Sequence, residues 1–199
     1  MLYMTPQSSP TQSLSSERWG QIMTPKRWSN HIQDGRLWCM DNGIFTGKFE
    51  EVSFWSKLDR VQQYKKTCLF VVAPDVVSNA IATMSAWRYW GMQIKEHGWP
   101  VAFAAQDGQE LFDFPPDFDA LFIGGSTEWK MSNHALDCIK RAKALGKWVH
   151  VGRVNSQKRI RHFQLAGVDS VDGTSVCFAP DKNYQVLNRA LMARPLFTI

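Results

Sequence analysis

The chain has 199 residues, of which 44% are apolar and 21% charged, and its formal net charge is +5. This balance excludes a disordered or fibrous chain, and the length suits a single domain that spans residues 1–199 and buries a sizeable core. Because neither a signal peptide nor an apolar run of about 18 residues is present, we expect a cytoplasmic protein with no membrane partner.

Short apolar runs recur along the chain and are typical of buried strands. They cover residues 37–40, 68–73, 101–105, 120–123, 148–152 and 168–171. Helical patterns lie between several of them, at residues 78–97, 133–145 and 156–166, with Ser78 and Ser156 as expected N-caps and Gly98, Gly146 and Gly167 as expected ends. This alternation predicts a parallel sheet with right-handed crossovers.

Polar residues or glycines follow these runs at once. They are Asp41, Asp75, Gln106, Asp107, Gly124, Gly125, Arg153, Asn155 and Asp172. An open sheet would concentrate such residues at one switch point, whereas a barrel collects them at one mouth, so we predict a compact α/β fold, a (β/α) barrel of the TIM type. About 250 residues are typical of that fold, so an incomplete barrel stays open, with residues 1–4 and 175–179 as candidates for further strands.

Two of these carboxylates stand in small-residue contexts, Asp41 in Asp-Asn-Gly and Asp172 in Asp-Gly-Thr. Either motif alone is typical of a turn. At two strand ends of one barrel, however, the pair fits a glycosidic centre. Such a centre needs a carboxylate at the anomeric carbon and a second group that moves protons at the leaving base.

A second set of residues suits the recognition of a guanine-like base. A carboxylate such as Asp75 can accept both N1–H and N2–H₂. The amide of Gln106 and a backbone N–H from Gly124 or Gly125 can donate to O6, since no Cβ blocks the approach to a glycine. The alternative is a tight turn at residues 106–108 and close packing at the glycine pair.

Basic residues are concentrated between residues 130 and 161, where nine Lys or Arg face a single acid, Asp137. Such a concentration is typical either of a solvated helix face or of a surface that contacts phosphates. For the second alternative we expect the nucleic-acid contacts to come from Arg153, Lys158, Arg159 and Arg161.

The four cysteines, Cys39, Cys68, Cys138 and Cys177, are far apart in the sequence and form no zinc-type spacing. We therefore expect reduced thiols, no metal site and no cofactor.

Five motifs occur together in one order: DNG-IF at 41–45, APD at 73–75, AAQDG at 104–108, FIGG at 122–125 and GVDSVDGT at 167–174. In this order and spacing, over roughly residues 37–175, the chain resembles the tRNA-guanine transglycosylase superfamily. These enzymes exchange guanine for a 7-deazaguanine through a covalent sugar–enzyme intermediate. The resemblance implies that Asp172 is the nucleophile and that Asp41 acts in proton transfer and base binding. It also implies that Asp75, Gln106, Gly124 and Gly125 bind the base.

The chain differs from the tRNA enzymes in its shorter length and in lacking their Cys/Cys/Cys/His zinc module. The tracts FIGGSTEWK at 122–130 and HVGRVNS at 150–156 resemble the compact DpdA-type branch, which includes phage-encoded members and inserts 7-deazaguanines into DNA. The function this implies is the exchange of guanine in DNA for a free 7-deazaguanine base, such as 7-cyano-7-deazaguanine.

Three alternatives stay open. One is a tRNA-guanine transglycosylase, and another is a hydrolytic nucleic-acid glycosylase that leaves an abasic site. The third is a binding module without catalysis, against which the presence of both Asp41 and Asp172 argues.

Overall fold

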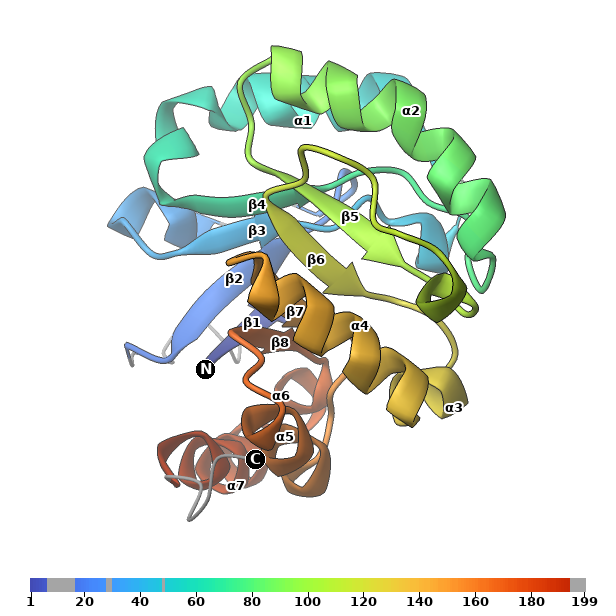
Figure 1. Cartoon of the computed structure of the whole chain (residues 1–199). Coiled ribbons are helices and arrows are strands. Elements are labelled where there is room, and N and C mark those ends of the chain that lie inside the picture. Colours follow the sequence, from blue (N-terminus) through green and yellow to red (C-terminus); the bar gives the residue numbers. More distant parts are fainter. Residues whose placement is uncertain (7–16, 28–29, 48, 194–199) are drawn as a thin grey trace.

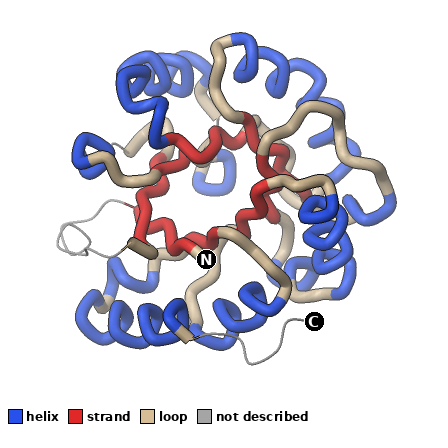
Figure 2. Tube along the Cα trace, turned by 60° about the vertical axis from the view of Figure 1, so that its left-hand side comes forward, coloured by secondary structure: helices blue, strands red, loops and turns tan. Residues whose placement is uncertain are grey.

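A computed structural model describes residues 1–6, 17–27, 30–47 and 49–193, and its centre is a closed barrel of eight parallel strands in chain order (Figures 1 and 2). The strands are β1 (Leu2–Pro6), β2 (Trp19–Met23), β3 (Trp38–Met40), β4 (Cys68–Val72), β5 (Val101–Ala105), β6 (Ala120–Ile123), β7 (Trp148–Val151) and β8 (Ser170–Asp172). β8 pairs with β1, and Met4 lies opposite Asp172. The predicted TIM-like barrel is confirmed, and the alternative of an incomplete barrel is wrong.

All six apolar runs form strands, and residues 1–4 contain most of β1. The structure corrects the prediction in two places. Residues 175–179 form no strand, because Ser175–Phe178 is the short helix α6. The remaining strand is β2, which the sequence hides because Gly20 and Gln21 interrupt its apolar pattern.

Helices surround the barrel (Figure 2). The α-helices are α1 (Glu51–Val61), α2 (Ala80–Glu96), α3 (Thr127–Lys130), α4 (Asn133–Ala144), α5 (Gln157–Leu165), α6 (Ser175–Phe178) and α7 (Pro180–Met192). In the described ranges they are accompanied by the 3₁₀ turns η2 (Asn30–Asp34), η3 (Ile44–Thr46), η4 (Gln62–Thr67) and η5 (Gln109–Leu111). In Figure 1, α1 and α2 lie on the side opposite α5, α6 and α7. No helix of the described ranges is both long and apolar enough to cross a membrane.

The connection between β5 and β6 and the described part of the connection between β2 and β3 carry no α-helix, which shortens the chain that the barrel needs. Only η5 lies between β5 and β6, and only η2 lies between β2 and β3. The three predicted helices are present as α2, α4 and α5, whereas α1, α3, α6 and α7 are not among the predictions.

The helix caps follow the sequence with one exception. Ser156 caps α5 as predicted, since its side chain accepts a hydrogen bond from the Arg159 N–H. For α2, however, Asn79 is the cap instead of Ser78, because the Asn79 side chain accepts from the Ala82 N–H. Ser78 lies just outside the helix with a φ of 58°.

Buried side chains form two clusters that follow the alternation of residues along the strands. On β4, Phe70 and Val72 belong to an inner cluster that fills the barrel, whereas Val71 belongs to the outer cluster between strands and helices. The same alternation on β5 places Ala102 and Ala104 inside. Because side chains alternate across a strand, each strand contributes to both the barrel filling and the helix contacts.

Gly20 of β2 makes room inside the barrel for Met4 of β1. A Cβ at residue 20 would lie 2.6 Å from the Met4 sulfur and 2.8 Å from the Leu37 carbonyl oxygen. The second contact is with backbone, which cannot move away like a flexible side chain. Gly20, which interrupts the apolar pattern of β2 in the sequence, is therefore required by the packing of the barrel interior.

We expect Gly20→Ala to lower the free energy of unfolding by about 1–3 kcal/mol, because the methyl group overfills the interior. Denaturation in urea, followed by circular dichroism, measures this. Gly47→Ala is the matched control, since a Cβ there meets no atom within 4 Å. Equal stability of Gly20→Ala and the wild type would contradict this account of β2.

Candidate active site

The carboxyl ends of the strands bring the predicted site residues to one end of the barrel. They are Asp41 after β3, Asp75 after β4, Gln106 after β5, Gly124 and Gly125 after β6, Arg153 after β7, and Asp172 as the last residue of β8. The strands are parallel and the barrel is closed, so all of these residues surround one mouth.

Asp172 is held at the mouth by one of its two carboxylate oxygens. Its Oδ1 lies 3.1 Å from Nε2 of His150 and accepts a hydrogen bond of 3.2 Å from the Arg153 N–H. Its Oδ2 accepts no hydrogen bond from the described residues, and the side chain is 16% exposed. The residue therefore presents one anchored oxygen and one oxygen that is available to react.

Asp41 lies in surroundings that favour its neutral form. Burial and, to a smaller extent, the nearby carboxylates of Asp172 and Asp75 raise the pKa of Asp41 to about 6, against the opposing effects of Arg153 and of the Gly43 N–H, which donates to Oδ1 at 2.9 Å. A carboxyl group with this pKa can both donate and accept a proton near neutral pH.

The Asp75 carboxylate is fixed by two side-chain amides. Its Oδ1 accepts from Nδ2 of Asn42 at 2.6 Å, and its Oδ2 accepts from Nε2 of Gln106 at 2.5 Å. Burial raises the pKa of Asp75, and the hydrogen bond from Asn42 opposes this shift. A carboxylate offers about four lone-pair sites, so two remain for a ligand. Asn42 was not singled out from the sequence, although it lies within the Asp-Asn-Gly motif.

The structure revises the predicted contribution of Gln106 and the glycine pair. The Gln106 side-chain carbonyl oxygen accepts from the N–H groups of Ser78 and Gly125, and the Gly124 N–H donates to the Ala105 carbonyl. Neither glycine N–H is therefore free to read O6 of a base in this conformation. A Cβ at residue 124 would collide with the Gln106 amide, so the glycine lets Gln106 reach Asp75.

An arginine and an aromatic ring connect two sides of the mouth. The guanidinium of Arg153, after β7, lies 4.0 Å from the ring centroid of Phe45 in the loop after β3, and its Nη2 donates to the Gly125 carbonyl. Arg153 has a φ of 62°, which is rare for a residue with a side chain. Phe45 is 57% exposed, so its ring is accessible at the mouth.

Lys130, at the end of α3, interacts electrostatically with Arg153 and Asp172 at the mouth, although the sequence groups it with the surface cations. It is only 4% exposed, and its Nζ donates to the Gly152 carbonyl at 2.7 Å. Burial, together with the positive charges of Arg153 and Arg159, lowers the pKa of Lys130 to about 7, against the opposing effect of Asp172. Its burial depends on the fold around α3, which no local pattern reveals.

The basic residues between 130 and 161 do not share one face. Lys158, Arg159 and Arg161 lie on α5, which starts at the mouth, and Lys158 and Arg161 are exposed. By contrast, Lys143 forms an ion pair of 2.7 Å with Asp169, which precedes β8 at the other end of the barrel. Only the α5 residues and Arg153 remain candidates for contacts to a polyanion at the mouth.

No group of three or more His, Cys, Asp or Glu within the described ranges is arranged to hold a metal ion. No known family model and no curated protein matches the chain. The case for a function therefore depends on the geometry of the mouth and on the five motifs of the sequence.

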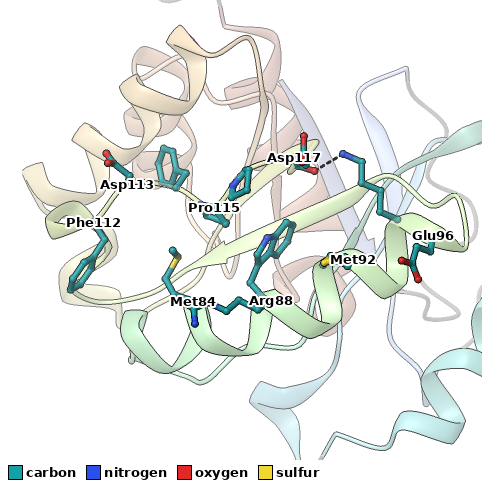
Figure 3. Close-up of a pocket in the computed structure, with 13 residues that line it drawn as sticks. Met84, Arg88, Met92, Glu96, Phe112, Asp113, Pro115 and Asp117 are labelled. Carbon is teal, nitrogen blue, oxygen red and sulfur yellow. Dashed lines mark hydrogen bonds between the residues drawn. The ribbon is translucent and has the colours of Figure 1, made fainter.

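A groove of about 820 Å³ lies outside the barrel, between α2 and residues 112–117 (Figure 3). Trp87, Met84 and Phe112 line it together with two prolines, and Lys95 donates a hydrogen bond to the Asp117 carbonyl at its edge. It contains none of the residues of the mouth.

We expect Asp41→Asn to stabilise the fold at pH 8 by up to about 3 kcal/mol, since ionising a group with a pKa near 6 in the folded chain costs more than ionising it at its ordinary pKa near 3.8. The sign follows from linkage. The folded chain binds the Asp41 proton more tightly, so the wild type loses stability as the pH rises from about 4 to 6.

Thermal unfolding of wild type and Asp41→Asn at pH 4 and pH 8 measures this difference. The two proteins should be equally stable at pH 4. A variant that is less stable than the wild type at pH 8 would show that the Asp41 carboxylate is well solvated or well paired. Asp137→Asn, at an exposed position on α4, is the control for removing a carboxylate.

Proposed function

We propose that this protein is a base-exchanging nucleic-acid glycosylase that replaces guanine in DNA with a free 7-deazaguanine base. The observation that carries the proposal is the pairing of two unlike carboxyl groups at one barrel mouth. Asp172 has one anchored and one available oxygen, and Asp41 has a pKa raised to about 6. A nucleophile and a proton-transfer group of this kind suit a double displacement at a sugar carbon.

In the first step, the available oxygen of Asp172 attacks C1′ of the target nucleotide. A C–O bond forms, the C1′–N9 bond breaks with its electron pair moving to the guanine, and neutral Asp41 supplies the proton that the departing base takes up. In the second step, Asp41 receives a proton from the incoming 7-deazaguanine. N9 of this base then attacks C1′, and Asp172 leaves as a carboxylate. Atoms and charge balance without a cofactor.

Asp75 is the proposed reader of the base edge. Two amides orient its carboxylate and leave lone pairs for the adjacent N1–H and N2–H₂ donors of guanine. Adenine presents an acceptor at N1, which would leave Asp75 without these contacts at a cost of about 1–3 kcal/mol for each unpaired group. In this proposal, Gln106 does not contact O6 but donates to Asp75, and the Gly125 N–H holds the Gln106 amide in place.

The target nucleotide has to be flipped out of a duplex or met in a single strand, because the C1′–N9 bond is inaccessible in the stack. The exposed ring of Phe45, in the loop that follows Asp41, offers a surface for stacking. DNA is chosen over tRNA in this proposal because the tracts at residues 122–130 and 150–156 resemble the compact branch that modifies DNA. A hydrolytic glycosylase would use the same carboxylates with water as the second nucleophile.

We expect Asp172→Ala to abolish the exchange of labelled guanine into DNA while the fold remains intact, because no other group supplies the attacking oxygen. The measurement compares matched DNA and tRNA oligonucleotides, with and without a free 7-deazaguanine, and identifies the products by nucleoside mass spectrometry. Asp169→Asn, outside the mouth, is the matched control. Wild-type turnover by Asp172→Ala would refute the nucleophile, and incorporation only into tRNA would refute DNA as substrate. Abasic sites without incorporation would indicate hydrolysis.

We also expect neutralising Lys158, Arg159 and Arg161 together to weaken DNA binding without changing which base is exchanged. Removing one phosphate interaction should lower the log–log salt slope by about 0.9 for duplex DNA or about 0.7 for a single strand. The control neutralises three cations that lie elsewhere, Arg88 on α2, Lys66 on η4 and Lys140 on α4. An equal decrease of the slope in both triple variants would mean that α5 has no special part in binding.

A further inference from the structure

A chain of hydrogen bonds runs through the interior of the barrel and ends at Asp172. Nε1 of Trp148 donates to Oγ of Ser170 at 2.9 Å, and Oγ of Ser170 lies 2.8 Å from Nδ1 of His150. Nε2 of His150 lies 3.1 Å from Oδ1 of Asp172. All four residues come from β7 and β8, at alternating positions that face the barrel interior.

In this chain of hydrogen bonds, only one choice of donors and acceptors satisfies every group. The indole N–H of Trp148 can only donate, so Ser170 has to accept from it. The Ser170 hydroxyl has no acceptor other than Nδ1 of His150 among the described residues, so its hydrogen is satisfied only there. This leaves the hydrogen of the neutral imidazole on Nε2, where Asp172 accepts it. An imidazole with its hydrogen on Nδ1 would instead present a bare Nε2 to the Asp172 carboxylate.

Packing holds the His150 ring in this position. The residue is fully buried, the ring of Phe122 stacks on it at 4.9 Å between centroids, and Phe70 contacts it edge-on at 5.2 Å. The imidazole is therefore held by contacts with two aromatic rings as well as by its hydrogen bonds. Among the described residues, its only hydrogen-bond partners are Ser170 and Asp172.

We propose that His150 is a positioning residue for the exchange reaction, which donates from Nε2 to Oδ1 of Asp172 and thereby orients Oδ2 toward the sugar. This inference rests on the proposed function. The hydrogen bond is stronger to a carboxylate than to an ester, because an ionised acceptor binds a donor more tightly. It therefore favours the departure of Asp172 from C1′, the step in which the carboxylate regains its charge.

The first test reads the His150 hydrogen position without any activity. Nitrogen-15 NMR of histidine-labelled protein is practical because the chain has five histidines, and His150→Gln assigns the resonances. We expect a hydrogen on Nε2, a bare Nδ1, and a large shift of the Nε2 resonance in Asp172→Ala. A hydrogen on Nδ1, or no response to Asp172→Ala, would overturn the proposal.

The second test uses kinetics. His150→Phe keeps a ring in the barrel but removes the donor, so kcat should fall roughly 10- to 100-fold, the size of a hydrogen bond to a charged group. The fraction of protein carrying the covalent sugar, seen on a denaturing gel, should rise because release of Asp172 slows. His150→Gln places an amide donor near the same position and should recover much of kcat. Val149→Ala, the neighbour on the outer face of β7, is the control for repacking.

The results separate the two proposals. If the wild type exchanges no base, the proposed function fails, while the NMR measurement still decides whether His150 donates to Asp172. If the wild type exchanges and folded His150→Phe keeps both kcat and the covalent fraction unchanged, the positioning role is refuted. If His150→Phe does not fold, Ser170→Ala takes its place. This variant keeps Asp172 and His150 but removes the hydroxyl that holds the imidazole hydrogen on Nε2. We expect it to lower kcat as His150→Phe does, but by a smaller factor.

Discussion

The pairing of β8 with β1 is the constraint on which the rest of the structure depends. It places Met4 opposite Asp172 and turns a row of parallel strands into a closed ring. Closure leaves no sheet edge, and it directs every second side chain into a space that only small or well-matched groups can fill. Ala102, Ala104 and Gly20 are small and Met4 and Phe70 are large, and together they fill the barrel interior.

Closure also buries polar groups that would otherwise be hydrated, and the barrel satisfies them in two networks. One network connects Asp172 through His150 and Ser170 to Trp148. The other crosses the mouth from Asn42 through Asp75 to Gln106. Because an unpaired buried polar group is costly, each network fixes its carboxylate in one orientation. The rigidity of the mouth thus follows from the same rule that stabilises the core.

The sequence predicts the strands that read as continuous apolar runs and the residues that follow them, because both depend on local pattern. It does not reveal β2, since Gly20 is explained only by Met4 on a neighbouring strand. Nor does it reveal that Lys130 is buried or that His150 faces the nucleophile, because both depend on register and on contacts between distant segments. Ser175–Phe178 has the composition of a strand, but β1 already occupies the place beside β8, and these residues turn into a helix.

In the protein without a ligand, the Arg153 guanidinium occupies part of the mouth, because it contacts the Phe45 ring and the Gly125 carbonyl. A molecule that stacks on the ring face covered by the guanidinium, or that bonds to the Gly125 carbonyl, has to displace the arginine first. Its apparent affinity is therefore its intrinsic affinity multiplied by the fraction of molecules in which the arginine has already moved away. Substrate selection at this site is therefore a competition. A ligand whose own charge attracts the arginine elsewhere, as a phosphate does, gains access that an uncharged base alone does not.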